Sequence, residues 1–424
     1  MAALVRPVRL CEYARGRDNN FTLLRLLASL TVVLYHSGPA LGIQGGRELL
    51  FDFVGRSFGE MALDMLFVTS GFLITASLFN RGDLNHFLWA RALRLYPALW
   101  LMLPLTVFLL APALTTLPIK DYCSAKATWD YFAKGATIIG GIRYSLPGVF
   151  ETLPLKGEFN GSLWTLPVEA RMYVYLAAGW LTFSFAPKIR VPALSVIAPV
   201  AAAAMMTAIL TARTRGSISN ANVAVFMFFY GASLYFWRDR LFLNLATFAA
   251  LPLLVLGTAM LDRTLAFAVY LLCLPPFLLC LAYIPGGRIR AVNRWGDYSY
   301  GVYIYAFPVQ QTLALFFPKL SMLAMAGAAG AVSFALAFCS WNLVEKRAMG
   351  LKDACAEVTA RAFRAARRRI ALALRFTGPP PEGAVTMPRK HHKPEEIVAK
   401  LREVDVLTSQ GKSVADAIRS ASLR

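Results

Sequence analysis

The chain has 424 residues, of which 57% are hydrophobic and only 16% are charged. This composition excludes an ordinary soluble domain and predicts a polytopic membrane protein. The formal net charge of +20 comes largely from short connections and a basic tail, so we assign it to membrane topology and anionic lipid headgroups rather than to nucleic acid.

Ten apolar stretches follow one another along the chain. Each is long enough, or nearly so, to cross a ~30 Å hydrocarbon core as a helix of about 20 residues. The stretches are Phe21–Leu41, Phe58–Phe79, Tyr96–Ala113, Val168–Ala186, Val191–Ala212, Ala221–Trp237, Phe242–Leu261, Thr264–Pro285, Tyr298–Phe317 and Ser321–Val344. They predict an all-α integral membrane fold with about ten transmembrane helices.

The basic residues of the short connections predict the orientation. With the N-terminus inside, the inner connections hold fourteen Lys and Arg residues and the short outer ones hold six. The positive-inside rule therefore favours a cytoplasmic position for both termini. The first apolar stretch is longer than the core of a signal peptide and lacks a cleavage pattern, so we expect it to be retained.

The chain divides into four parts by composition. Residues 1–20 are predicted to be a cytoplasmic N-terminal segment, and residues 21–344 the ten-helix membrane domain, with one long outer loop at about 114–163. Residues 345–386 form a basic cytoplasmic tail, rich in Ala and Arg and suited to the membrane surface. Residues 387–424 have the composition of a soluble segment.

The last segment, residues 387–424, begins MPRKHHKPEEIVAKLREVD. It resembles the start of insertion-sequence transposases, whose N-terminal domain is a helix-turn-helix. The chain ends where a recognition helix would be needed. We therefore expect a truncated gene-fusion remnant without function and no nucleic-acid partner; the alternative is a tethered DNA-binding role.

Arg25 and His36 lie inside the first apolar stretch, where charged and titratable groups are costly. Eleven positions separate them, so on a helix their side chains fall within about 20° of each other and about 16 Å apart along the axis. This spacing predicts one helix face that presents a guanidinium and an imidazole to the bundle interior. The structural alternatives are a snorkelling arginine and a histidine that only bonds neighbouring helices.

Two acids, Asp64 and Glu169, are the other ionisable candidates within the spans. Asp64 precedes a predicted turn at Ser70-Gly71-Phe72, and Glu169 follows Ser162-Leu163-Trp164. A carboxylate close to His36 would orient the imidazole and stabilise its charge as a general base. The sequence leaves open which acid lies there, and helix packing explains either acid equally well.

Several ordered motifs resemble the membrane acyltransferase 3 family, over about residues 18–350. These are the Arg25 to His36 spacing, DMLFVTSGFLI at 64–74, RALRLYP at 91–97, SLWTLPVE at 162–169, SYGVY at 299–303, and Glu345-Lys346. Two positions depart from the family pattern: Phe307 and its neighbours stand where many members have a histidine, and Arg347 stands where proline is usual.

The resemblance implies a multi-pass enzyme of the bacterial inner membrane that O-acylates, most often O-acetylates, a carbohydrate at or beyond the outer face. It implies acyl-CoA, most often acetyl-CoA, as the donor substrate, and Arg25 and His36 as the residues tied to catalysis. The acceptor is expected to be an exopolysaccharide, a lipopolysaccharide or an oligosaccharide. No permanently bound cofactor is expected, and the six cysteines show no metal-ligand spacing.

With the N-terminus inside, Arg25 lies near the cytoplasmic edge and His36 toward the outer edge, so we expect the two to have different roles. Arg25, Arg91 and Arg94 would hold the phosphates of coenzyme A by charge-assisted bonds near the cytoplasmic edge. His36, with Asp64 or Glu169 in support, would act on a sugar hydroxyl as a general base or accept the acyl group itself.

Alternatives remain at the level of residues and of function. Arg91 and Arg94 also fit a purely topogenic role, and the tyrosines between Tyr298 and Tyr305 are predicted to form an aromatic belt at the inner interface. A transporter or flippase of lipid-linked saccharides would also bury an arginine and a histidine along a path, although broken and repeated spans would then be expected.

Overall fold

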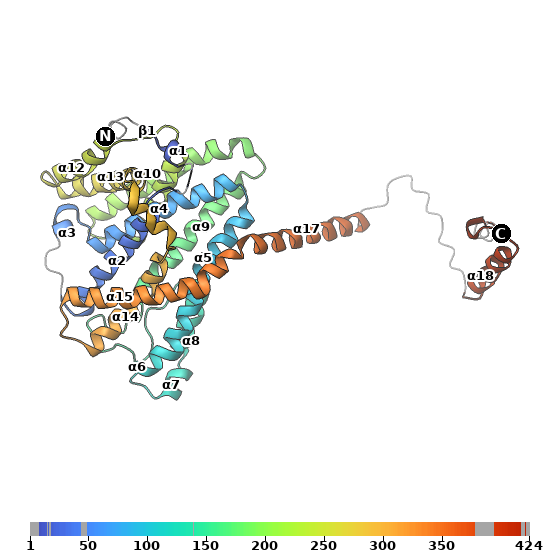
Figure 1. The fold of residues 1–424 in the computed structure, drawn as a ribbon, viewed down its shortest axis with the longest axis horizontal. Helices are drawn as coiled ribbons and strands as arrows, with labels where there is room; N and C mark the ends of the chain where they lie inside the picture. The colour runs from blue at the N-terminus through green and yellow to red at the C-terminus, as the bar shows by residue number, and fades with distance from the viewer. Residues whose placement is uncertain are drawn as a thin grey trace. The chain divides into compact units, whose positions relative to one another are not determined.

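The computed structural model describes residues 8–14, 16, 18–43, 49–138, 140–377, 394–416 and 420. The chain forms two compact units, Met1–Arg361 and Ala362–Arg424. The candidate site lies within the first unit, which is a helical bundle (Figure 1).

The bundle begins with a short strand and continues through helices of very different lengths. The first part consists of β1 (Val8–Arg9), α1 (Leu10–Tyr13), α2 (Phe21–Ala40), α3 (Leu49–Val54), α4 (Phe58–Arg81), α5 (Leu84–Pro104), the π-helical turn η2 (Leu105–Leu110), α6 (Ala111–Leu114), α7 (Ile119–Ser124), α8 (Lys126–Thr137), the 3₁₀ turn η3 (Gly161–Trp164) and α9 (Thr165–Thr182). The second part consists of α10 (Pro187–Thr214), α11 (Asn220–Phe236), β2 (Phe242–Leu243), α12 (Leu245–Ala259), α13 (Arg263–Tyr283), η4 (Gly287–Arg294), α14 (Ser299–Phe316), α15 (Met322–Ser340), η5 (Trp341–Glu345), α16 (Lys346–Gly350) and α17 (Lys352–Thr377). Within the last segment, residues 387–424, the structure also describes α18 (Pro394–Ser409).

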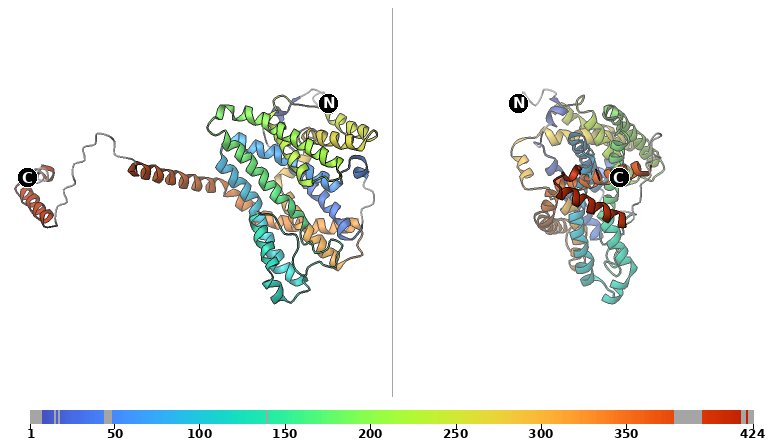
Figure 2. Two further views of the ribbon diagram at one scale, coloured as in Figure 1. Left: turned by 180° about the vertical axis from the view of Figure 1, so that it is seen from behind. Right: turned by 90° about the vertical axis from the view of Figure 1, so that its right-hand side faces the viewer.

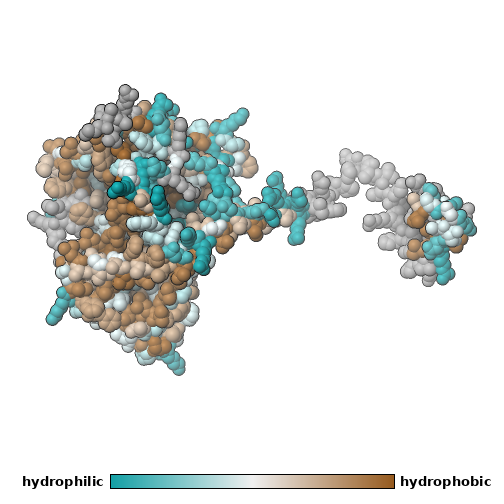
Figure 3. Space-filling model, viewed as in Figure 1, coloured by the Kyte–Doolittle hydropathy of each residue, from teal (hydrophilic) through white to brown (hydrophobic). Residues whose placement is uncertain are grey.

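Each of the ten apolar stretches overlaps at least one helix of the bundle. Six stretches of the described residues are long and apolar enough to cross a membrane: Phe21–Ala40, Phe58–Arg81, Leu84–Leu114, Pro187–Thr214, Arg263–Tyr283 and Met322–Ile370. Much of the visible face of the bundle is apolar (Figure 3), as a surface in contact with lipid requires. The all-α membrane class is therefore supported, whereas the count of ten spans and the orientation of the termini stay predictions.

The long connection between α6 and α9 is structured. The short helix α7 is followed by α8, which packs against α5, and Figures 1 and 2 show both helices close to the end of α5. Beyond them, Ser145 and Glu158 form an isolated antiparallel bridge. This bridge brings two distant parts of the connection together beside the candidate site.

A close helix crossing joins α4 to α11, and it explains the small residues in the middle of α4. A Cβ atom on Gly71 would lie 2.0 Å from the carbonyl oxygen of Phe228, and a Cβ atom on Gly231 would lie 2.3 Å from that of Val68. Small residues allow helix backbones to approach in this way. The turn predicted at Ser70-Gly71-Phe72 is wrong, because α4 continues through these residues and Gly71 serves the contact between helices.

Replacing Gly71 with Ala should disrupt this crossing, because the added methyl group meets backbone atoms that cannot move without separating the helices. We expect a clear loss of folded protein and of melting temperature in detergent. Gly257→Ala is the matched control, since nothing lies within 4 Å of a Cβ atom at Gly257 in α12. Equal behaviour of the two variants would contradict the assignment.

Candidate functional site

Three cavities lie along α2, α9 and α14. The arginine cavity has a volume of about 300 Å³ and its lining includes Arg25, Arg91, Arg94, Glu169, Tyr173, Asp297 and Tyr300. The middle cavity has a volume of about 50 Å³ and its lining includes Arg25, Ser29, Phe67, Thr165, Glu169, Ser299, Tyr300 and Tyr303. The histidine cavity has a volume of about 450 Å³ and is lined by Tyr35, His36, Pro39, Tyr144, Leu155, Glu158, Gly161, Trp164 and Phe307.

The lining residues of the three cavities follow one another in the same order on all three helices. On α2 the order from the arginine cavity to the histidine cavity is Arg25, Ser29, His36; on α14 it is Tyr300, Tyr303, Phe307; and on α9 with η3 it is Tyr173, Thr165, Gly161. Two of the cavities even share Arg25, Glu169 and Tyr300. The predicted common face of Arg25 and His36 is therefore one wall of a row of cavities.

Asp297, which precedes α14, binds two of the arginines. Its Oδ2 atom lies 2.9 Å from Nη1 of Arg25 and 2.7 Å from Nη2 of Arg94. Burial alone would raise the pKa of the Asp297 carboxyl, but Arg25 and Arg94, together with hydrogen bonds from Ser299, hold it well below its usual range. Arg94 also lies 3.5 Å from the buried carboxylate of Glu345. The charges of Arg25 and Arg94 are thus largely balanced by the protein itself.

Arg91 is different from these two arginines. Among the residues that the structure describes, no carboxylate lies within ion-pair distance of Arg91, whereas Arg25 and Arg94 are both paired. The Nε atom of Arg91, like that of Arg25, is buried without a hydrogen-bond partner. Glu169, which shares the cavity, accepts a hydrogen bond from the hydroxyl of Tyr173. Arg91 is therefore the arginine of this cavity that is left to bind an anion.

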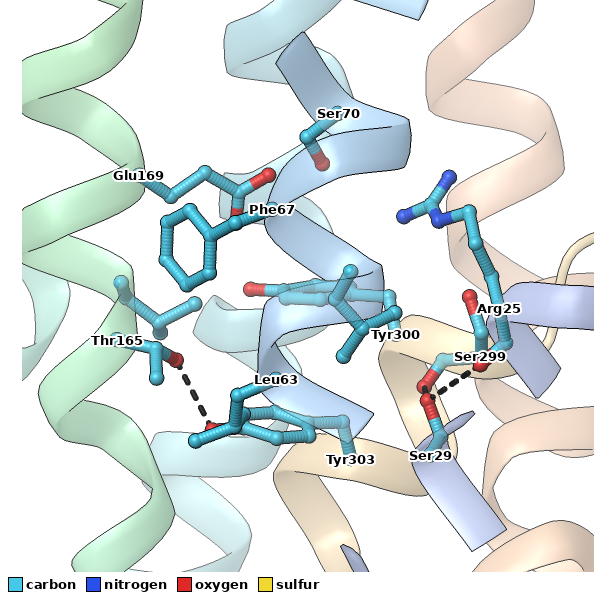
Figure 4. A pocket seen from close by; sticks show the side chains of 12 residues that line it. Arg25, Ser29, Leu63, Phe67, Ser70, Thr165, Glu169, Ser299, Tyr300 and Tyr303 are labelled. Atoms are coloured by element: carbon cyan, nitrogen blue, oxygen red, sulfur yellow. Dashed lines mark hydrogen bonds between the residues drawn. The ribbon is translucent and has the colours of Figure 1, made fainter. Parts of the chain in front are cut away.

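The middle cavity is narrow and its polar groups bond to one another (Figure 4). Arg25 and Glu169 lie on opposite sides of it, with Phe67 and Tyr300 between them. The hydroxyl of Thr165 donates to that of Tyr303 at 3.0 Å, and Tyr303 in turn donates to the carbonyl of Ser162 at 3.0 Å. These bonds join α14 to η3 and α9 where the middle cavity gives way to the histidine cavity.

The aromatic belt predicted between Tyr298 and Tyr305 is wrong. Tyr298, Tyr300, Tyr303 and Tyr305 are all buried, and the hydroxyl of Tyr300 donates to the carbonyl of Leu95 at 3.0 Å. A buried tyrosine needs a partner for its hydroxyl. Tyr300 and Tyr303 find theirs on α5 and η3, and Tyr298 donates to a backbone carbonyl just before its own helix. The run therefore lines and joins the interior of the bundle.

His36 is oriented by the backbone of its own helix. Its Nδ1 atom lies 2.9 Å from the carbonyl oxygen of Val32, which can only accept, so Nδ1 carries the proton and the neutral ring leaves Nε2 free to accept one. The ring packs edge-on against Phe307, with the centroids 5.4 Å apart. Phe307 thus fills the position where the resemblance implied a second histidine.

The acid that shares a cavity with His36 is Glu158, which the sequence did not single out. Neither Asp64 nor Glu169 lines the histidine cavity; Glu169 lines the other two. Glu158 is positioned by its backbone bridge to Ser145. Helical periodicity does not predict such a bridge, so the sequence offered no sign of this residue.

Asp64 belongs to a buried ion pair apart from the three cavities. Arg56 binds it in a bidentate manner, with distances of 2.7 Å and 3.1 Å, and the hydroxyl of Tyr270 donates to it at 2.9 Å. Arg56 also donates to the side chain of Asn220 at 2.6 Å. Because these contacts join the starts of α4 and α11 to α13, Asp64 fixes helix packing.

Removing Asp64 should therefore affect stability rather than chemistry. Asp64→Ala leaves the guanidinium of Arg56 buried without its main partner, which costs about 3–5 kcal/mol in comparable buried pairs. We expect a lower melting temperature in detergent and unchanged kcat in the folded fraction. Asp52→Asn is the control, since Asp52 is exposed and 3.6 Å from Arg263; a fall in kcat specific to Asp64 would contradict this role.

The model of an acyltransferase domain matches residues 18–342. The chain is 28% identical over 358 residues to a protein of Shigella phage Sf6 named O-acetyl transferase, an alignment that covers 78% of this chain and 96% of the phage protein. It is also 27% identical over 374 residues to nodulation protein 10 of Rhizobium leguminosarum bv. viciae, covering 80% of this chain and 96% of that relative. No solved structure matches the chain.

The family match ends before the last segment. Residues 387–424 lie beyond it, and residues 387–393 also lie outside the described part of the chain. The predicted transposase-like remnant therefore stays a prediction.

Proposed function

We propose that this chain carries an acyl group across the bacterial inner membrane. The proposal starts from two facts: the chain belongs to the acyltransferase family over residues 18–342, and it is an O-acyltransferase with several membrane helices. The donor is cytoplasmic acyl-CoA, most often acetyl-CoA, and the acceptor is a hydroxyl of an exported carbohydrate. The observation that carries this proposal is the order of the three cavities along α2, α9 and α14. The proposal includes a cytoplasmic position for both termini, and the arginine cavity then faces the cytoplasm.

The arginine cavity supports binding of the donor. Coenzyme A carries several phosphates, and guanidinium groups bind phosphate through paired, charge-assisted hydrogen bonds. Arg91 makes the direct contact, since its charge is not balanced by a carboxylate of the described residues. Arg25 and Arg94, both held by Asp297, shape the cavity around Arg91.

The histidine cavity supports the chemistry of transfer. Nε2 of His36 takes the proton of the acceptor hydroxyl, and the hydroxyl oxygen attacks the thioester carbonyl that reaches it through the middle cavity. The carbon–sulfur bond then breaks, and the proton held by His36 passes to the departing thiolate of coenzyme A. The fixed bond from Nδ1 to Val32 keeps the ring in the tautomer that this step needs.

Loss of the imidazole should remove catalysis and leave the fold intact. We expect His36→Ala to lower kcat by about 10²–10⁴-fold, the usual contribution of a general base, with normal membrane insertion and melting temperature. Transfer from labelled acetyl-CoA by purified protein in lipid nanodiscs measures this. Full activity in the variant would overturn the assignment of His36.

Loss of the unpaired arginine should act mainly on donor binding. A charge-assisted hydrogen bond contributes about 1.5–3 kcal/mol, so Arg91→Gln should raise the KM for acetyl-CoA by about ten- to hundredfold, with a smaller change in kcat. Arg91→Lys should recover part of the loss, because it restores the charge without the planar fork.

Arg288→Gln is the matched control for this prediction, because Arg288 is an exposed arginine that lies outside the three cavities. An unchanged KM in Arg91→Gln, or equal effects of both substitutions, would show that Arg91 serves topology alone.

A further inference from the structure

We propose, resting on the function above, that the histidine cavity is a subsite for a neutral pyranose ring of the acceptor, with the carboxylate of Glu158 and the aromatic side chains of Tyr144 and Trp164 as its binding groups. The cavity has a volume of about 450 Å³, within the ordinary range of small-molecule sites. Its lining combines apolar aromatic surface with a few polar groups, which suits a sugar ring with its apolar faces and peripheral hydroxyls.

Glu158 and Tyr144 are held side by side by the backbone. The carbonyl oxygen of Tyr144 accepts from the backbone N–H groups of Phe159 at 2.6 Å and Asn160 at 3.1 Å. The side chain of Asn160 donates to the carbonyl of Ile304 in α14 at 2.9 Å. The two binding groups therefore come from a segment that is anchored to the same helix as Phe307.

A second anchor ties the segment to a later part of the same helix. The buried side chain of Gln311, also in α14, donates to the carbonyl oxygens of Leu155 at 3.1 Å and Glu158 at 2.8 Å. Such fixed positions reduce the entropy that binding would otherwise cost. The subsite is thus built before the acceptor arrives.

The carboxylate of Glu158 lines the same cavity as the catalytic histidine. A Cβ atom on Gly161 would lie 2.6 Å from Oε2 of Glu158 and 3.1 Å from the ring of Phe307. The same ring packs against His36. Glu158 and His36 therefore both lie near this ring and line one cavity, so a hydroxyl bonded to the carboxylate would belong to the same sugar as the hydroxyl at His36.

The charge of the cavity selects among sugars. No lysine or arginine occurs among its described lining residues, and Glu158 is the only acid there. A carboxylate accepts hydrogen bonds from hydroxyl groups but repels a second negative charge. The acceptor ring is therefore neutral, and rings with a carboxylate are disfavoured.

Matched sugars test this inference directly. Methyl glucoside and methyl glucuronide differ at one carbon, which carries a hydroxymethyl group in the first and a carboxylate in the second. We measure binding of each to the full chain in nanodiscs by saturation-transfer NMR, and acetyl transfer from acetyl-CoA by mass spectrometry. Wild type should favour the neutral sugar by about tenfold or more.

Two substitutions separate charge from folding. Glu158→Gln should reduce this preference, and Glu158→Lys should reverse it, both with a normal melting temperature. The control is Asp121→Asn in α7, since Asp121 is an exposed acid of the same connection outside the cavity. Its preference should equal that of wild type.

The outcomes also separate this inference from the function on which it rests. Binding without any acetyl transfer in wild type would overturn the proposed function and leave the subsite supported. Equal binding of the two sugars, no binding of either, or a preference unchanged in Glu158→Lys would overturn the subsite, whether or not transfer to another acceptor occurs.

Discussion

The structure depends on how it offsets the desolvation free energy of charges buried in an apolar bundle. The ion pairs of Asp297 with both Arg25 and Arg94 provide this compensation. An unpaired ion in such a place costs several kcal/mol. One carboxylate within 2.9 Å of two guanidinium groups ties α2 and α5 to the start of α14. Since α2 and α14 line all three cavities and α5 lines the arginine cavity, the ion pairs that make the charges tolerable also fix the walls of the proposed path.

At the histidine end of the path, the structural requirement is a fixed tautomer of His36. A general base needs a fixed tautomer, and many enzymes achieve this with a carboxylate on the second ring nitrogen. Here the carbonyl of Val32, one helical turn earlier, does the same. A neutral orienting group adds no charge at membrane depth, and it leaves Glu158 free to face the cavity rather than His36 Nδ1.

The sequence predicted the fold class and the common wall of Arg25 and His36, because helical periodicity and apolar length are local properties. It did not find Asp297 or Glu158, because their partners lie far away in the chain: Arg25 and Asp297 are 272 residues apart. Asp64 was judged by its depth alone. Its partner Arg56 lies only eight residues earlier, so the two residues are close enough in the sequence to suggest an ion pair. The sequence alone, however, did not favour a structural role for Asp64 over a catalytic one.

Charge also separates the two ends of the row of cavities. The arginine cavity combines three guanidinium groups with Asp297 and Glu169, whereas the histidine cavity carries Glu158 as its single acid among the described lining residues. A polyanionic donor is attracted at one end and disfavoured at the other. Between them, a middle cavity of about 50 Å³ has room for a small group but not for a phosphorylated nucleotide. The geometry and the electrostatics therefore act in the same direction: the donor stays at the arginine end, and only its acyl terminus can approach His36.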